Sequence, residues 1–302
     1  MSEDVSSISV IIPAYNSSPS LPKLLDSLAK QTLKPKEIMV VDDCSNDNTI
    51  GQARTCPVTL IQNDRNRGPA YSRNRGILES RGEILAFVDA DCVCAVDWIE
   101  KTEQAFSDSG TNVVVGKVLF HPQSLLSNAI HDLGWPGGGN VGFEKIWKVD
   151  KDGRTKHITS GNFAARRKIF ETCGVFNEGF PCGGEDVELS ERWTHQGAVI
   201  YFRPEIQIVH SSMDSFSGFM KWHFYRGRSN VYVHDALGSK RSSLLLFEKV
   251  KVFGRIILNS LKRLSFFLVV PLMVIMFFCQ LLGYLTECLM RVFKSYKGAH
   301  KK

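Results

Sequence analysis

The sequence lacks several features that would assign it to a familiar class. Its eight cysteines form no C-x-x-C pair and no zinc-ligand spacing, which favours free thiols in a reducing compartment over a disulfide framework. The first ten residues, MSEDVSSISV, contain neither the basic nor the apolar stretch of a secretory signal. No internal repeat or low-complexity segment is evident. We therefore expect the bulk of the chain to lie in the cytoplasm.

Acidic residues are scarce in the last part of the chain. Residues 240–302 contain 12 Lys and Arg against Glu248 and Glu287, a balance of +10, which leaves −4 for residues 1–239 of the overall +6. Basic tails bind nucleic acid or anionic lipid. An adjacent apolar run favours lipid, so we expect a membrane partner and no nucleic acid.

Short apolar runs alternate with helical patterns over residues 8–110. The expected strands are Ile8–Ile12, Glu37–Val41, Val58–Ile61 and Ile84–Val88. The expected helices run from Leu21 to Leu28, Ala70 to Ser80 and Trp98 to Phe106. This alternation predicts an α/β fold with a mainly parallel, Rossmann-like sheet covered on both faces. Ligands of such sheets bind beyond the carboxyl ends of the strands.

Residues 111–210 are less regular. The expected elements are strands at Val113–Phe120 and Val199–Phe202, helices at Arg166–Cys173 and Asp186–His195, and a mobile glycine-rich loop at Gly134–Gly142. This part of the sequence leaves the arrangement of any substrate-contacting side chains open.

A long apolar segment follows. Leu264–Leu285 is nearly uncharged, is flanked by basic residues, and approaches the roughly 20 residues that cross a bilayer. We expect it to enter a membrane, either as a single span or as a re-entrant hairpin bent at Pro271. Leu244–Leu261 mixes basic with apolar residues and is expected to form an amphipathic helix on the interface.

The most specific site pattern is Asp89-Ala90-Asp91, directly after the strand Ile84–Val88. Alternation along a strand places both carboxylates on the same side. Two such oxygen ligands suit Mg²⁺ or Mn²⁺, which also bind diphosphates. The alternative interpretation is a solvated acidic loop.

Two further groups belong to the same predicted edge. Asp42 and Asp43 end the second strand and can accept hydrogen bonds from a base or ribose, while Asp47 better fits a helix cap. Arg73 and Asn74, in the stretch around Gly68-Pro69, can meet phosphate oxygens.

Asp186 follows Gly183-Gly184 at the start of an expected helix and is the candidate general base for an acceptor hydroxyl. An acid stabilised by the helix dipole is the alternative. His210 ends an apolar run and can reach a metal or phosphates, whereas a structural role stays open for it and for His223. Trp135 and Trp222 can stack on a sugar or fill the core, and Arg226-Gly227-Arg228 can contact diphosphate or lipid head groups.

Taken together, six segments in this order and spacing resemble glycosyltransferase family 2. They are SVIIPAYN (Ser9–Asn16), VVDDCSND (Val40–Asp47), NRGPAYSRNRGI (Asn66–Ile77), GEILAFVDADC (Gly82–Cys92), SGNFAARRKIFETCGVFNEGF (Ser160–Phe180) and GGEDVELSERWTHQG (Gly183–Gly197). The resemblance covers roughly residues 8–235. It implies a GT-A fold and transfer of a sugar, with inversion, from a nucleotide-sugar such as a UDP- or GDP-sugar.

The resemblance also implies roles for particular residues. Pro13, Ala14, Tyr15 and Asn16 would line the nucleotide pocket, Asp42 and Asp43 would hold the base or ribose, Asp89 and Asp91 would serve the ribose and the metal, and Asp186 would be the catalytic base. Together with the residues considered above, the expected nucleotide-sugar site comprises Pro13, Ala14, Tyr15, Asn16, Asp42, Asp43, Gly68, Arg73, Asn74, Asp89 and Ala90, and the expected Mn²⁺ or Mg²⁺ site comprises Asp89, Asp91 and His210. Cys44 departs from the family, which usually has Gly there, and Cys92 stands where an acid or Thr is common.

We therefore expect a catalytic domain over residues 1–235 and a membrane-associated region over residues 236–302. The acceptor would be a lipid-linked or cell-surface glycan, with the catalytic domain on the cytoplasmic side of the cell membrane. A processive synthase is disfavoured because no Q-x-x-R-W motif is present. A nucleotidyltransferase or dehydrogenase is disfavoured because no glycine-rich phosphate loop follows the first strand. A non-catalytic binding protein that kept the fold is the remaining alternative, and the oligomeric state is open.

Overall fold

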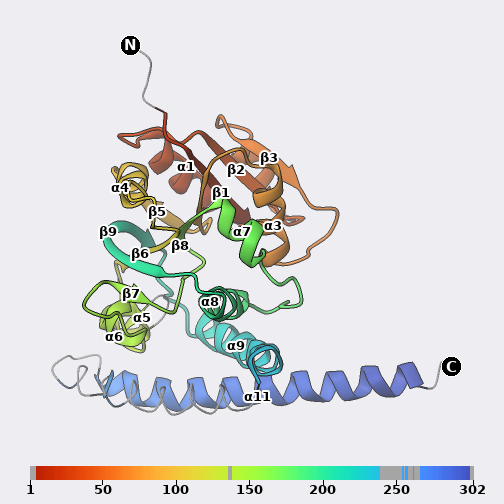
Figure 1. Ribbon diagram of the computed structural model, residues 1–302. Coiled ribbons are helices and arrows are strands. Elements are labelled where there is room, and N and C mark those ends of the chain that lie inside the picture. Colours follow the sequence, from red (N-terminus) through yellow and green to blue (C-terminus); the bar gives the residue numbers. More distant parts are fainter. Residues whose placement is uncertain are drawn as a thin grey trace.

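The computed structural model describes residues 5–134, 138–238, 254, 256, 257, 261 and 266–299. Most of the expected interfacial helix Leu244–Leu261 lies outside these residues, as does Trp135. The described chain forms a central sheet flanked by helices, with one long helix along the side of the molecule (Figure 1).

The sheet has the strand order β3-β2-β1-β4-β8-β6-β9-β5, and β7 pairs with β9. The strands are β1 Ile8–Ala14, β2 Glu37–Asp42, β3 Thr59–Gln62, β4 Ile84–Val88, β5 Cys92–Cys94, β6 Val113–Phe120, β7 Arg154–Thr155, β8 Asn162–Arg166 and β9 Ile200–His210. The four strands expected within residues 8–88 are all present.

The two halves of the sheet differ in direction. Strands β1 to β4 are parallel, as expected, because a helix carries the chain back between each pair. Strand β8 runs antiparallel to both β4 and β6, and β9 runs antiparallel to β5 and β7. The sheet is therefore mixed, and the expectation of a mainly parallel sheet holds for its first half. Strand β8 reverses because residues 121–161 start at the carboxyl end of β6 and lead into β8 from that same edge.

Helices cover both faces of the sheet, as the sequence predicts. The helices are α1 Leu21–Ala29, α2 Thr49–Ala53, α3 Pro69–Glu79, α4 Trp98–Ala105, α5 Leu125–Asp132, α6 Phe143–Ile146, α7 Arg167–Cys173, α8 Glu185–His195, α9 Phe216–Leu237 and α11 Phe266–Ala299, with the 3₁₀ turn η1 Gly139–Val141. Helices α1 and α4 pack with Val10 and Ile12 of β1, while α3, α7 and α8 share the opposite core with Ile11. The alternating side chains of β1 thus separate two cores.

Helices α5, α9 and α11 form a third apolar cluster. It joins Ile130 of α5, Phe219 of α9 and Val269, Leu272 and Met276 of α11. By length and composition α11 contains one stretch, Phe266–Phe293, apolar enough to cross a membrane. Helix α11 continues through Pro271 near its start, so the structure has no hairpin bend at that residue.

His223 of α9 lies in the contact between α9 and α11. Its ring is 3.1 Å from the Nε2 atom of Gln280 and packs edge-on against Phe219 and Trp222. Burial lowers the pKa of His223 to about 3, and the charge of Arg226 acts in the same direction. The neutral imidazole is therefore part of the packed interface, which is a structural role.

We predict that His223 makes the protein less stable in acid. Because its pKa is about 3 when folded and near 6.5 when unfolded, the unfolded chain binds an extra proton between these values. The free energy of unfolding should fall as pH drops through this window, by up to about 1.4 kcal/mol per pH unit from this group. Urea unfolding in mild detergent at pH 4.5 to 7.5 measures this, and His223→Gln should flatten the slope. Substitution of the exposed His121 by Gln should leave it unchanged, and equal slopes for all three proteins would contradict the prediction.

Candidate active site

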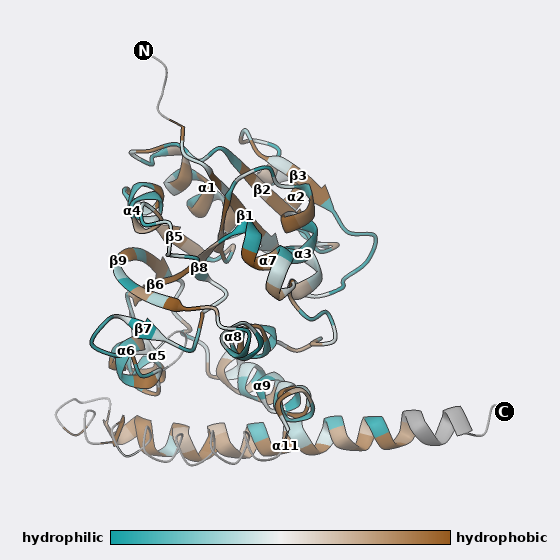
Figure 2. Cartoon of the chain, in the orientation of Figure 1, coloured by the Kyte–Doolittle hydropathy of each residue, from teal (hydrophilic) through white to brown (hydrophobic). Residues whose placement is uncertain are grey.

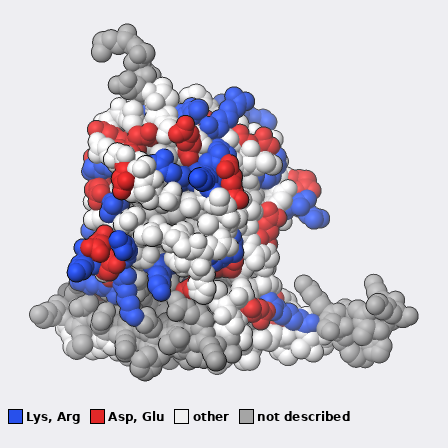
Figure 3. All heavy atoms as spheres, in the orientation of Figure 1, with Lys and Arg blue, Asp and Glu red and all other residues white. Residues whose placement is uncertain are grey.

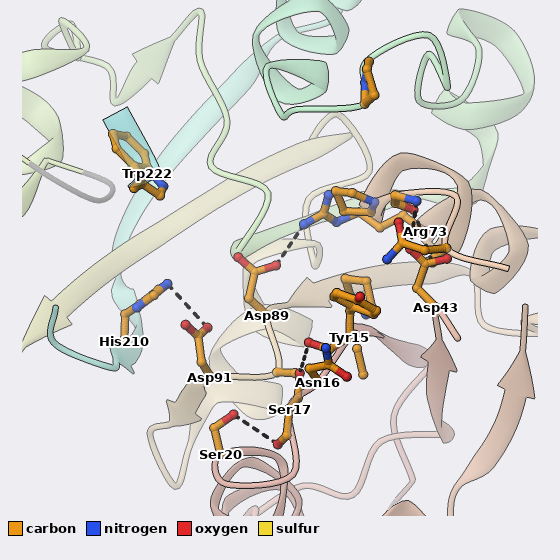
Figure 4. Close-up of a pocket in the computed structure, with 18 of the residues that line it drawn as sticks. Tyr15, Asn16, Ser17, Ser20, Asp43, Arg73, Asp89, Asp91, His210 and Trp222 are labelled. Atoms are coloured by element: carbon orange, nitrogen blue, oxygen red, sulfur yellow. Dashed lines mark hydrogen bonds and ion pairs between the residues drawn. The ribbon is translucent and has the colours of Figure 1, made fainter. Parts of the chain in front are cut away.

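A pocket of about 680 Å³ opens at the carboxyl edge of the sheet. Figure 4 shows acidic, hydroxyl and aromatic side chains facing into it from several loops. The expected site residues that line it are Pro13, Ala14, Tyr15, Asn16, Asp43, Gly68, Arg73, Asp89, Ala90, Asp91 and His210. The loops after β1, β2, β4 and β9 therefore meet at one place, as parallel strands require.

The loop after β1 is tied to the loop after β2. The Asn16 N–H donates to the Ser45 hydroxyl at 2.9 Å, and its side-chain oxygen accepts from the Asn46 N–H at 2.8 Å. Asn16 has φ of 50°, a conformation that Asn tolerates better than most residues. Tyr15 is left half-exposed at the pocket rim, where its ring is free to meet a flat ligand such as a base.

Asp43 lines the pocket on the side opposite Tyr15 and Asn16. Its carboxylate accepts hydrogen bonds from the Asn63 amide at 2.7 Å and from the backbone N–H groups of Arg67 and Gly68 at 2.9 and 2.7 Å. Asp43 thus fixes the loop that leads into α3. Asp42 is buried beneath the turn, accepts from the Ser45 N–H at 3.1 Å, and does not line the pocket.

Cys44 stands in the left-handed region with φ of 62°. Glycine adopts this conformation without steric cost, which explains why the family usually has glycine where this chain has Cys44. Cys44 adopts the same conformation, so the turn is kept and Asp43 stays in the pocket wall.

Asp91 and His210 lie next to each other in the pocket wall. The His210 Nε2 atom is 3.5 Å from the Asp91 carboxylate, as drawn in Figure 4. Their approach follows from the pairing of β5 with β9, which sets Cys92 opposite His210. Ser211 adds a second tie, because its N–H and hydroxyl both donate to the Asp91 carbonyl.

These residues have the chemistry of a divalent-cation site. Ligand atoms of Asp91, Cys92 and His210 lie within 4.8 Å of one another. Burial and the charges of Asp91 and Asp89 raise the pKa of Cys92 well above its ordinary range, which disfavours the thiolate ligand. Burial also raises the pKa of Asp91, with His210 opposing and Asp89 adding to the rise. A carboxylate and an imidazole fit Mn²⁺ or Mg²⁺ with most coordination positions left for phosphate and water.

Asp89 has a different partner. Its carboxylate accepts from the Arg73 guanidinium at 2.8 Å, and the same guanidinium donates to Glu185 at 2.8 Å. The side chains of Arg73 and Glu185 are only 4% and 5% exposed, so this is a buried ion pair. Burial lowers the pKa of Arg73, but Asp89 and Glu185 more than compensate and keep it above its ordinary value.

The Arg73 bridge brings Asp186 to the same region. Asp186 follows Glu185 in α8 and is half-buried, and its charge acts on both Arg73 and Glu185. It does not line the pocket itself. The turn before it is held by α9, because the Ser229 hydroxyl donates to the Gly183 carbonyl at 2.5 Å.

Asn74 lies outside the pocket lining. Its side chain instead binds the Phe176 backbone and Glu178, which ties α3 to the segment before α8. Arg228 also has a structural partner, since it pairs with Glu287 of α11 at 2.8 Å. Trp222 of α9 does line the pocket, on the side away from Tyr15, Asn16 and Asp43.

Two supporting residues were not assigned roles from the sequence. A Cβ atom on Gly161 would lie 2.6 Å from the Asp89 carboxylate, so only glycine leaves Asp89 in place. Asn162 is fully buried and binds the carbonyls of Lys117 and Ile206 and the Trp98 indole N–H. Both belong to the segment SGNF, which drew attention only through the family resemblance.

The model of the family described as "Glycosyl transferase family 2" matches residues 9–174, more than half of the chain. The chain belongs to glycosyl transferase family 2. Among the chain's relatives, glycosyltransferase AglE of Haloferax volcanii is 28% identical over 239 residues, 75% of this chain and 73% of AglE. An uncharacterised glycosyltransferase of Haemophilus influenzae is 37% identical over 116 residues, 38% of each chain.

Solved structures agree with the fold of the family. The mannosyltransferase PcManGT from Pyrobaculum calidifontis, in complex with GDP-Man and Mn²⁺, has a TM-score of 0.61 at 17% identity, over 94% of this chain and 89% of that one. Residues 1–349 of TarS from S. aureus, in complex with UDP, have a TM-score of 0.53 at 21% identity, over 73% and 64%. The GT-A fold is thereby confirmed, with the mixed sheet described above.

We predict that Arg73 is required for a stable fold as well as for the site. Arg73→Met would leave the buried Glu185 and the neighbouring Asp89 without their shared cation, which typically lowers the free energy of unfolding by about 3–5 kcal/mol. Denaturant unfolding measures the loss. Arg67→Met is the matched control, because the exposed Arg67 pairs with Asp64 at the surface and should matter little. Equal stability of the two variants would contradict this account of Arg73.

Proposed function

We propose that this family 2 member is a metal-dependent, inverting glycosyltransferase that uses a UDP- or GDP-sugar and acts at a membrane. The observation that supports this most is the Arg73 bridge, in which one guanidinium pairs with both Asp89 and Glu185. Asp89 lies near Asp91 and His210, and Glu185 precedes Asp186 in the chain. The base at the start of α8 would then lie next to the pocket that holds the donor. The resemblance to proteins solved with UDP and with GDP-Man supports the donor class.

The nucleotide would occupy the subsite between the β1 and β2 loops. Tyr15 and Asn16 line one side of it and Asp43 the other. Asp43 already holds three hydrogen-bond donors, so it would act mainly by fixing the wall that the base or ribose meets. We assign the donor roles of Gly68, Ala90 and the Pro13-Ala14 backbone to this same pocket.

Asp91 and His210, with Asp89 nearby, would hold Mn²⁺ or Mg²⁺. A bound cation supplies positive charge that stabilises the departing nucleoside diphosphate. His210 keeps its ring oriented through Nδ1, which lies 2.9 Å from the Ser211 carbonyl, and presents Nε2 toward Asp91. The Mn²⁺ in the complexes of PcManGT and of GalNAc-T7 supports this choice of ions.

Asp186 would accept the proton of the acceptor hydroxyl as it attacks the anomeric carbon. The carboxylate is at the start of α8, where the helix dipole favours negative charge. Glu185 is less suited to this role, because it is buried and paired with Arg73. Asp42 and Asn74 would support the pocket from behind rather than touch the donor.

The acceptor would approach from the side of α9, where Trp222, Met213 and Pro181 line the pocket. Helix α9 packs on the apolar helix α11, which favours a lipid-linked or cell-surface glycan. We propose that residues 1–235 form the catalytic domain on the cytoplasmic side and that residues 236–302 attach it to the membrane. AglE and the succinoglycan biosynthesis protein ExoO of Rhizobium meliloti are among its relatives, and the latter's name supports a glycan product.

We predict that Asp186→Asn abolishes transfer while donor binding survives. Loss of a general base typically lowers kcat by about 10²-fold or more, and the substitution removes no donor contact. Sugar transfer to extracted lipid acceptors and thermal shift with UDP, GDP and their sugars measure the two effects. Asp26→Asn, at an exposed position on α1, is the control. Turnover of Asp186→Asn within threefold of wild type would contradict the assignment.

We predict that His210→Gln weakens binding of Mn²⁺ in the presence of UDP or GDP by roughly tenfold or more, as loss of one metal ligand or its support commonly does. Calorimetric titration of the protein with Mn²⁺ measures this without relying on turnover. The exposed His195→Gln is the matched control and should bind as wild type does. Binding by His210→Gln within twofold of the control would remove His210 from the metal site.

A further inference from the structure

Helix α11 has one face that is entirely apolar and exposed. Between Phe266 and Phe293 every exposed residue is apolar, and these residues recur at helical spacing along one side. Phe267 at one end is 75% exposed, Phe278 in the middle 66% and Phe293 at the other end 65%. This stripe is about 39 Å long at 1.5 Å per residue. In Figure 2 the first part of α11 is brown, and its later part alternates between brown and teal.

The opposite face of α11 is packed against α9 at very short range. A Cβ atom on Gly227 of α9 would collide with the Gln280 backbone, and one on Gly283 of α11 would collide with the Phe224 carbonyl. These two glycines let the helix backbones touch. Next to them, Glu287 is 3% exposed and accepts from Arg228 at 2.8 Å and from the Tyr232 hydroxyl at 2.6 Å.

The contact continues along both helices in the same direction. Phe219 packs in the cluster with Met276, His223 meets Gln280, Arg228 meets Glu287, and Asp235 pairs with Arg291. From Phe219 to Asp235 this is about 24 Å of α9. Polar and charged pairs therefore lie along the same stretch of α11 that carries the apolar stripe.

This packing argues against α11 as a simple span of the bilayer. If α11 stood across the hydrocarbon, α9 would have to follow it, together with the exposed Lys221 and the half-buried Arg226. Each charge in the bilayer centre costs about 2.5–3.5 kcal/mol or more. Helix α9 also supplies Trp222 to the pocket, so the pocket itself would enter the hydrocarbon.

We propose that α11 lies in the plane of the membrane, with its exposed stripe in one leaflet and α9 on the aqueous side. This rests on the membrane association proposed above and specifies its geometry. The face of α11 opposite the stripe is already covered by protein, so only the stripe is left for lipid to bury, and a helix in the interface plane buries one face in this way. In Figure 1, α11 runs along one side of the molecule beneath α9, so the stripe can meet a flat surface without moving the body.

Charge favours lipid over a second copy of the chain as the cover for this stripe. Residues 240–302 carry 12 Lys and Arg, and of the two acids Glu287 is already paired with Arg228. Two such regions would repel each other, whereas anionic head groups would attract them. On the face seen in Figure 3, acidic and basic side chains are interspersed over the body, so no single-sign patch there competes for the membrane.

The test uses the full chain with a C-terminal epitope tag. Flotation with vesicles of phosphatidylcholine and phosphatidylglycerol measures binding, and protease treatment of sealed inverted membranes from expressing cells measures sidedness. We expect the tag to be cleaved on the same side as the catalytic domain, without detergent. We expect Phe278→Asp to weaken flotation on the order of tenfold or more, since burying one Phe contributes at least the 1.4 kcal/mol that corresponds to tenfold. Leu78→Asp, at an exposed apolar position of α3, should float as wild type does.

Three other results would each overturn a different part of the proposal. A tag protected until detergent is added would overturn the in-plane geometry while leaving membrane association intact. No flotation of the wild type would overturn membrane association itself, and transfer assays would then test the enzymatic proposal separately. A dimer in light scattering that Phe278→Asp separates, with vesicle binding unchanged, would identify a second copy as the cover and overturn the proposal.

Discussion

The buried guanidinium of Arg73 is the interaction on which the site depends. The guanidinium lies between Asp89, which follows β4, and Glu185, which begins α8. Two segments almost one hundred residues apart are therefore joined by the same arginine side chain. Burying the charges of Arg73 and Glu185 is tolerable only because they are paired, since the desolvation cost is large, and the partly exposed Asp89 adds a second partner for the guanidinium. The pairing therefore fixes the distance between the metal-binding edge and the start of α8. Gly161 behind Asp89 and Ser229 behind Gly183 hold the two acids from outside.

Much of this arrangement follows from the sequence and some of it does not. The strands of the first half were predicted because each is a short apolar run that ends in polar residues, and those ends meet wherever the strands are parallel. Asp43, Asp89 and Asp91 were placed in one pocket for that reason. The position of His210 could not be predicted, because it depends on the pairing of β9 with β5. Strand β5 is only three residues long, and no pattern in Cys92–Cys94 marks it as a strand. Asp43 lines the pocket and Asp42 does not, because neighbouring side chains in an extended segment point to opposite sides. The sequence alone does not show which of the two faces the pocket.

The C-terminal region shows a different limit of the sequence. Length and hydropathy identify an apolar helix, but hydropathy averaged along the sequence does not distinguish one face of the helix from the other. The two faces of α11 differ because Gly283 and Glu287 both point at α9, and a single acid in an apolar run gives no sign of its partner. Helix α9 itself was missed as an element, because aromatic, basic and small residues follow one another in Phe216–Leu237 without a clear apolar stripe. Its buried positions became evident only when contacts on both sides, with Gly183 and with α11, were known.

The position of α9 sets a height. It lies between α11 and the Gly183-Gly184 turn, touching the first through Gly227 and the second through Ser229. Helix axes usually lie 8–10 Å apart, and the glycine contacts put α9 and α11 at the short end of this range. With α11 in the membrane plane as proposed, the start of α8 would stand less than about 20 Å above the surface. A hydroxyl that meets Asp186 would then be borne on a carrier whose first sugar or two project from the head groups. Long polymers would have to fold back to reach it, and a free sugar in solution would gain nothing from the tether.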